Sequence, residues 1–173
     1  MTTTDNTKAT STASAEWPLT FKQHNFVAYC YDTAGCSVLY KDDYYVKDDE
    51  GKVTAPSSSY GQNYQKNWGG GAQLGINNFP SPAVVVWRSK DGTKHEAKVD
   101  IADIFRDQRI LHNVPSEELP VDTVAIAGDP TIILEINNRA INVYMRAAVA
   151  LKDTETRRSD FRDEVILAYS HTY

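Results

Sequence analysis

The chain has 173 residues, a hydrophobic share of 41%, a charged share of 24% and a formal net charge of −5. This length and composition are sufficient for one domain with its own apolar core. Lysine and arginine are scattered singly rather than gathered in a stripe, and no run approaches the roughly 20 apolar residues that span a bilayer. The sequence therefore argues against a nucleic-acid-binding domain and against an integral membrane protein.

The N-terminal segment is rich in threonine, serine and alanine and contains no apolar core. Such a composition is typical of a disordered leader and not of a signal peptide or a folded element. We therefore expect a leader over residues 1–16 and a single domain over residues 17–173.

The first half of the domain alternates β-favouring runs with polar turns. Residues 25–31 and 36–40 flank a turn ending in Gly35, which predicts a hairpin. Residues 41–51 place acidic side chains around two tyrosines and predict an exposed strand end or loop. Residues 55–66 are polar and aperiodic, which indicates a long surface loop, and a run of three glycines follows it.

The second half repeats the alternation of strands and turns. An Asp-Gly pair predicts a hairpin of residues 83–89 and 93–99, and Asp100 is a candidate cap for a short helix. Further on, the pattern predicts a hairpin of residues 131–136 and 140–149, a charged loop over 152–163 and a terminal strand over 164–170. Seven or eight short strands with one short helix favour an antiparallel two-sheet β-sandwich, and a partly open barrel is the alternative.

The only two cysteines are Cys30 and Cys36, with five residues between them across the first predicted turn. They are compatible with a local disulfide in an oxidising compartment such as the periplasm, and equally with two buried free thiols. Their spacing does not match a zinc site or a thioredoxin-like motif. The sequence therefore predicts no metal and no redox role for them.

No catalytic constellation is evident in the sequence. The chain lacks the Gly-x-Ser-x-Gly turn of α/β-hydrolases, and its four histidines lie in separate segments with no metal-ligand spacing. The acidic run over residues 42–50 does not match a calcium loop, which favours a solvated acidic face. We therefore predict a protein that is not an enzyme and binds no cofactor, with an enzyme of unfamiliar design as a remaining hypothesis.

Tyrosine and tryptophan near polar loops provide the best functional lead, because these residues anchor protein interfaces and stack on sugars. The alternative interpretation is that about half of them only line the edge of the core, and for Trp68 we favour packing into the core. The candidate partner-binding residues are Asp42, Asp43, Tyr44, Tyr45, Asp48, Asp49, Tyr60, Tyr64 and Trp68.

Four motifs in a fixed order carry a resemblance to a protein family. They are Trp-Gly-Gly-Gly at 68–71, Asn-Phe-Pro-Ser-Pro at 78–82, Val-Val-Val-Trp-Arg-Ser-Lys-Asp-Gly at 84–92 and Val-Asp-Ile-Ala-Asp-Ile-Phe at 99–105. Over residues 26–149 the chain resembles uncharacterised bacterial envelope lipoproteins, some of which are similar to immunity proteins of type VI secretion lipase effectors. Those relatives begin with a lipoprotein signal and an acylated cysteine, which residues 1–16 lack.

The resemblance implies an immunity protein that binds a lipase or phospholipase effector and blocks its active-site cleft. It also implies a periplasmic location, with a membrane anchor in the native form, while the missing signal peptide keeps a cytoplasmic location open. The second hypothesis is a carbohydrate- or envelope-binding module that uses Trp68, Tyr60 and Tyr64 as a stacking platform.

Overall fold

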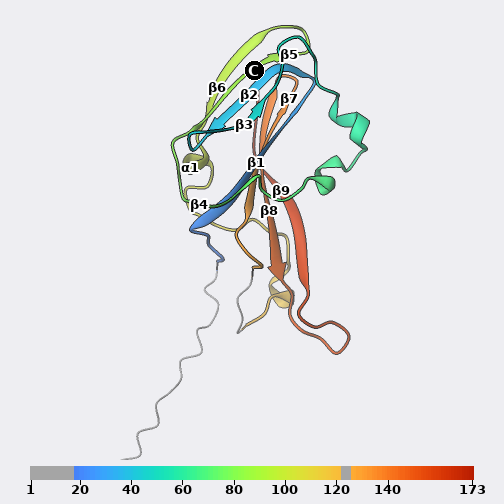
Figure 1. The fold of residues 1–173 in the computed structure, drawn as a ribbon. Coiled ribbons are helices and arrows are strands. Elements are labelled where there is room, and N and C mark those ends of the chain that lie inside the picture. Colours follow the sequence, from blue (N-terminus) through green and yellow to red (C-terminus); the bar gives the residue numbers. More distant parts are fainter. Residues whose placement is uncertain (1–17, 122–125) are drawn as a thin grey trace, which may run out of the picture.

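Two β-sheets face each other across one apolar core in the computed structural model, which describes residues 18–121 and 126–173 (Figure 1). The mainly β, two-sheet sandwich predicted from the sequence is confirmed. The predicted leader, residues 1–16, lies outside the described residues. Among the described residues, no helix is long and apolar enough to cross a membrane.

One sheet has five strands in the order β4-β1-β7-β8-β9. These strands are β4 (Gln73–Asn77), β1 (Gln23–Tyr31), β7 (Thr131–Asn137), β8 (Ala140–Ala150) and β9 (Phe161–Thr172). All neighbours are antiparallel except β1 and β7, which run parallel in an unbroken register from Asn25 opposite Thr131 to Tyr31 opposite Asn137. The sandwich therefore contains one parallel pair that the hairpin pattern of the sequence did not predict.

The other sheet has four antiparallel strands in the order β3-β2-β5-β6. These strands are β3 (Asp43–Lys47), β2 (Thr33–Tyr40), β5 (Ala83–Ser89) and β6 (Lys94–Val99). The short helix α1 (Ile101–Ile104) follows β6, and the Asp100 carboxylate accepts a hydrogen bond from the Asp103 backbone N–H at 3.1 Å, as a helix cap does. The described part of the chain also contains three single-turn 3₁₀ helices: η1 (Ser57–Tyr60), η2 (Tyr64–Asn67) and η3 (Ser116–Glu118).

The predicted hairpin between residues 25–31 and 36–40 is wrong. Strands β1 and β2 belong to different sheets and do not form a ladder with each other. Only Asp32 separates Tyr31 from Thr33, which is too short for a two-residue hairpin turn. Asp32 has a φ of 52°, and this left-handed conformation turns the chain from one sheet into the other.

The two later hairpins, β5 with β6 and β7 with β8, are confirmed. The terminal strand begins at Phe161, within the segment predicted as a loop, because its pairing with β8 continues from Thr172 opposite Ala140 to Phe161 opposite Ala150. The far ends of β8 and β9 project from the rest of the sandwich (Figure 1).

Alternation of side chains along the strands places the core between the sheets. Phe26, Leu134 and Val143 of the five-stranded sheet pack in one cluster with Val38 and Trp87 of the four-stranded sheet, and each of these residues is buried. The side chains between them on the same strands point to the opposite, outer face of the five-stranded sheet. That outer face holds the candidate site.

Candidate functional site: an aromatic pocket beneath a strap

A long connection between β3 and β4 lies against the outer face of the five-stranded sheet (Figure 1). We call residues 56–71 of this connection the strap. The sequence predicted a surface loop here, and the structure adds the 3₁₀ turns η1 and η2 to it. Gly61 ends η1 with a φ of 96°, a conformation that favours glycine, and the chain then turns into η2.

Trp68 fastens the end of the strap to the sheet. Its side chain is buried at 5% exposure, and its indole N–H donates a hydrogen bond to the Tyr31 hydroxyl at 2.8 Å. The indole stacks nearly parallel on the Tyr29 ring and meets the ring of Tyr144 edge-on. Trp68 is therefore a buried anchor, although it packs in a separate cluster with Val27, Tyr31 and Ile133 rather than between the two sheets.

A fully buried carboxylate, that of Glu135 on β7, lies beneath the strap. It accepts hydrogen bonds from the Tyr64 hydroxyl of the strap, from the Asn142 amide at 2.8 Å and from the Tyr144 hydroxyl at 3.2 Å. The Asn137 amide is a longer fourth donor at 3.4 Å. Burial of a carboxylate is costly unless hydrogen bonds satisfy it, and these neutral donors do so. Glu135 thereby ties the strap to β7 and β8.

Burial under the strap also changes the acidity of its tyrosines. Desolvation and the neighbouring Glu135 carboxylate raise the pKa of Tyr144 to about 12, and they raise that of Tyr64 as well. The pKa of Tyr31 is raised by burial, with a smaller contribution from Glu135. These phenols therefore stay protonated at neutral pH and remain hydrogen-bond donors.

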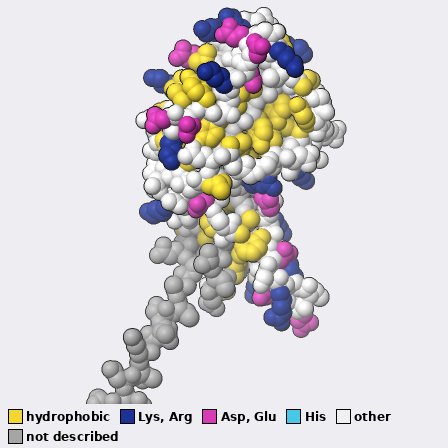
Figure 2. All heavy atoms as spheres, viewed as in Figure 1, with side chains coloured by type: hydrophobic (Ala, Val, Ile, Leu, Met, Phe, Trp, Pro, Cys, Tyr) yellow, Lys and Arg dark blue, Asp and Glu magenta, His cyan; other side chains and the backbone are white. Residues whose placement is uncertain are grey.

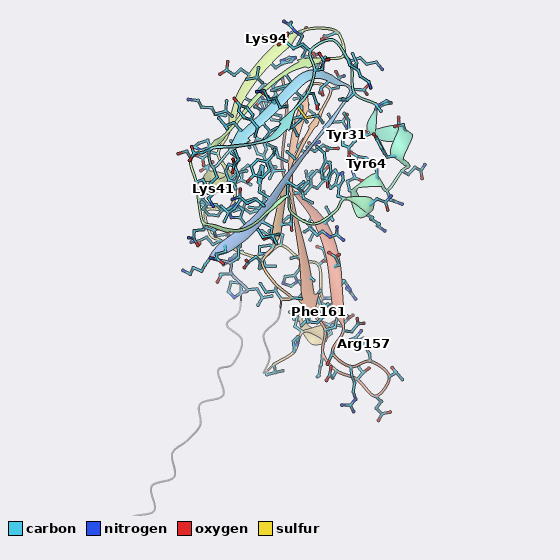
Figure 3. The ribbon with its side chains drawn as sticks, in the orientation of Figure 1. Tyr31, Lys41, Tyr64, Lys94, Arg157 and Phe161 are labelled. Atoms are coloured by element: carbon cyan, nitrogen blue, oxygen red, sulfur yellow. A yellow bond between two sulfur atoms is a disulfide. The ribbon has the colours of Figure 1, made fainter. Side chains whose placement is uncertain are left out.

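An open pocket of about 390 Å³ lies between the strap and β1. Tyrosine rings and the Trp68 indole form most of its wall, and Figure 3 labels two of these tyrosines, Tyr31 on β1 and Tyr64 on the strap. Tyr60 lies at the rim, where 58% of it is exposed and its ring meets Tyr31 edge-on at 5.6 Å. The full lining is Tyr29, Cys30, Tyr31, Tyr60, Tyr64, Asn67 and Trp68. We call this hollow the aromatic pocket.

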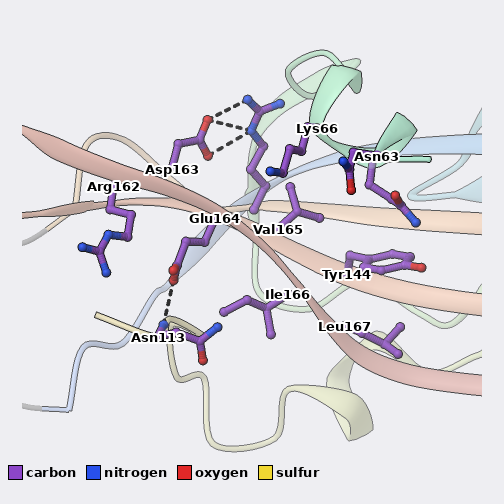
Figure 4. Close-up of a pocket in the computed structure, with 12 residues that line it drawn as sticks. Asn63, Lys66, Asn113, Tyr144, Arg162, Asp163, Glu164, Val165, Ile166 and Leu167 are labelled. Carbon is purple, nitrogen blue, oxygen red and sulfur yellow. Dashed lines mark hydrogen bonds and ion pairs between the residues drawn. The ribbon is translucent and has the colours of Figure 1, made fainter. Parts of the chain in front are cut away.

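A second hollow of about 700 Å³ lies on the other side of η2, against β8 and β9 (Figure 4). Most of its charged side chains are already engaged: Arg146 forms a bidentate ion pair with Asp163 and also donates to the Trp68 carbonyl, and Glu164 accepts from the Asn113 backbone N–H at 2.7 Å. This hollow is therefore a mixed surface whose polar groups mainly bind each other.

The acidic candidates from the sequence lie on and beside β3, the edge strand of the other sheet. Asp42, Asp43 and Asp49 are exposed, and Tyr44 is 57% exposed with the Lys47 ammonium 5.1 Å from its ring centre. Tyr45, by contrast, is half-buried against Phe26. Hydrophobic side chains, which include tyrosine, gather on the face between β3 and the strap (Figure 2).

A disulfide joins Cys30 of β1 to Cys36 of β2 and bridges the two sheets beside their shared corner. Cys30 also lines the aromatic pocket. A carboxylate oxygen of half-buried Asp48 lies within 4.8 Å of both sulfur atoms, and burial raises the pKa of this carboxyl group. The disulfide thus lies between Asp48 at the end of β3 and the wall of the aromatic pocket. Of the predicted partner-binding residues, the structure brings Tyr60, Tyr64 and Trp68 together in that pocket, whereas the others lie on or beside β3.

A serine, a histidine and an aspartate meet at the β5–β6 turn, and their geometry is structural. The buried Ser89 hydroxyl contacts the Asp91 carboxylate at 2.5 Å and the His95 Nε2 at 2.9 Å. Asp91 also accepts from the Thr93 backbone N–H, and these bonds lower the pKa of its carboxyl group to about 2. In a catalytic triad the acid orients the histidine and the serine is accessible, whereas here the acid closes a turn.

Sequence reasoning missed four residues of this region: Tyr29, Tyr31, Glu135 and Tyr144. One signal was available, because Glu135 interrupts the otherwise apolar run Ile-Ile-Leu-Glu-Ile of a central strand. A charged residue at such a position requires polar partners on the same face. The tyrosines gave no comparable signal, since tyrosine is common in strands.

Neither a protein-family model nor a curated protein nor a solved structure matches the chain.

Proposed function

We propose that the protein is an immunity protein, which binds a toxic lipase of the phospholipase class delivered by type VI secretion and blocks the active-site cleft of that lipase. The observation that carries the proposal is the aromatic pocket beneath the strap. Tyrosine rings and an indole form its wall and exposed Tyr60 lies at its rim, while exposed Tyr44 and acidic side chains lie on and beside β3. Exposed tyrosines around a preformed pocket are typical of the centre of a protein interface.

The disulfide supports the periplasm as the compartment of this proposed function. Disulfides persist in oxidising compartments and are rare in the bacterial cytosol. Cys30–Cys36 also stiffens the corner beside the pocket, and a rigid binding surface loses less conformational entropy when a partner binds.

A glycan-binding module is less well supported by the geometry. The platform suggested by the sequence uses Trp68, but its indole is buried and already stacked on Tyr29. The suggested platform is then reduced to exposed Tyr60 and half-buried Tyr64. We therefore favour a protein partner.

The test is to co-produce the protein with the product of the adjacent gene, which the proposal expects to be a lipase, and to measure both complex formation and survival of the cells. We expect a stable complex and rescue from toxicity. Alanine at Tyr44 or Tyr60 should weaken binding about 5- to 30-fold if each is a hot spot of the interface.

The matched control is Phe161→Ala, which removes another exposed aromatic ring on the projecting end of β9, far from Tyr31 and Tyr64 (Figure 3). This variant should bind as the unchanged protein does. Absence of both binding and rescue by the unchanged protein would refute the proposal, and glycan retention in its place would support the module hypothesis.

A further inference from the structure

The aromatic pocket has the volume and the wall of a site for one side chain or a small ligand. Its volume of about 390 Å³ lies near the lower end of typical ligand sites, about 300–1,000 Å³. Four tyrosines and one tryptophan form most of the wall, and the faces of aromatic rings carry negative potential that attracts cations. The wall therefore favours a positively charged group over an anionic one.

A buried negative charge behind this wall strengthens that preference. Glu135 contacts Tyr64, which lines the pocket. The two carboxyl oxygens of Glu135 accept four hydrogen bonds and donate none, which is the pattern of an ionised carboxylate. Its donors are neutral tyrosines and asparagines, and no ion pair involves Glu135 within residues 18–121 and 126–173. The charge of Glu135 is therefore balanced by hydrogen bonds and not by a cation.

An acidic group also lies close to Cys30 in the pocket wall, and the exposed Lys66 of the strap does not line the pocket. The carboxylate of Asp48 adjoins Cys30, and Asp49 and Glu50 follow it in the exposed turn. Arg146 pairs with Asp163. On β3 the Lys47 ammonium lies over the Tyr44 ring, which is an example within this chain of the contact that the pocket can offer.

We infer that the aromatic pocket receives a basic side chain, arginine or lysine, from the protein that binds this face. The ammonium or guanidinium group would lie against the tyrosine rings, with Glu135 behind them and Asp48 at the side. This inference rests on the proposed function, because it names the chemical group by which the partner is recognised.

The experiment titrates the full chain, labelled with ¹⁵N, with three capped tripeptides at constant ionic strength. Their central residues are arginine, lysine and citrulline, the last being a neutral analogue with the shape of arginine. The reporter is the indole N–H signal of Trp68, which is hydrogen-bonded to Tyr31 within the pocket wall. We expect saturable shifts with the arginine and lysine peptides and about fivefold weaker binding of the citrulline peptide.

Two variants at one exposed position separate the ring from the hydroxyl group. Tyr60→Leu removes the aromatic face and should weaken binding of the arginine peptide about two- to fivefold, whereas Tyr60→Phe keeps the face and should bind like the unchanged protein. Because Tyr60 is mostly exposed, neither change should disturb folding. Equal binding of the citrulline peptide, no shift with any peptide, or an unaffected Tyr60→Leu variant would overturn the inference.

The titration needs no partner protein, so its outcome is independent of the lipase experiment. Failure of the peptides to bind while the lipase complex forms would reject the basic anchor and leave the immunity function standing. Peptide binding without any lipase complex would support the pocket as a site for a basic group and reject the immunity function.

Discussion

The two faces of the five-stranded sheet are made by the same strands but are held in different ways. On β7, Ile132, Leu134 and Ile136 point into the core between the sheets. The alternate positions Ile133 and Glu135 point outward and are equally buried, but the strap covers them. The inner face depends on apolar contact with a second sheet, whereas the outer face depends on ring stacking and on hydrogen bonds to one carboxylate.

This difference separates stability from recognition. Apolar packing over the whole inner face supplies most of the free energy of folding. The strap contributes three aromatic rings, which together with Tyr29 and Tyr31 of β1 form an open pocket before any partner binds. Changes to the inner face should therefore lower global stability, and changes beneath the strap should mainly affect the pocket.

The largest expected effect is that of Leu134→Ala on the inner face. Leu134 is fully buried, and truncation of a buried leucine leaves a cavity, so the free energy of unfolding should fall by about 2–5 kcal/mol. Urea unfolding measures this change. The Trp68 indole N–H signal of the folded variant should keep its position, and a loss of the pocket signals at low urea would contradict the separation of the two faces.

Removal of the disulfide at the corner should have the next largest effect. Cys30 and Cys36 are six positions apart, and closing so short a loop stabilises a protein by about 2 kcal/mol in the chain-entropy model. The double variant Cys30→Ala, Cys36→Ala should lose about this amount in urea unfolding. The stability of the double variant should not respond to a reductant. The stability of the unchanged protein should fall in the presence of a reductant, towards the value of the double variant.

The parts of the fold and of the candidate site that could be predicted from the sequence are those made by local contacts. The hairpins around Gly92 and Asn138 and the cap at Asp100 follow from short-range turn chemistry, and the sequence predicts them correctly. The pairing of β1 with β7 joins segments about 100 residues apart, and no local signal specifies it. The site combines the strap with β1, β7 and β8, so only its exposed tyrosines and Trp68 could be named from the sequence.

A smaller effect is expected for Glu135→Gln beneath the strap. The glutamine keeps one acceptor oxygen but presents an amide N–H₂ group to neighbours that also donate, so the change should cost about 1 kcal/mol. Amide hydrogen exchange should speed up in η2, while the core strands keep their protection. Glu96→Gln on the exposed side of β6 is the matched control and should alter neither.

The smallest effect concerns the pH dependence of the one histidine on the inner face, His24, which is fully buried. The Asn78 amide nitrogen donates to the Phe21 carbonyl, so its oxygen faces His24 Nδ1 at 2.7 Å, and His24 Nε2 is then free to accept from the Tyr40 hydroxyl at 3.0 Å. These contacts suit the neutral ring. Burial is the main cause that lowers the pKa of His24 below 6.5.

Because the unfolded chain then binds the proton more readily than the folded chain, the contribution of His24 to stability is complete above about pH 6.5 and is lost as the pH falls towards the lowered pKa. His24→Gln, which can keep one donor and one acceptor, should flatten this part of the stability profile in urea unfolding between pH 7.5 and 5. A ring titration of His24 at or above pH 6.5, followed by NMR, would contradict the prediction. The outer face should instead respond to strongly alkaline pH. The pKa of Tyr144 is raised to about 12, and ionisation of this phenol would remove a hydrogen-bond donor to Glu135.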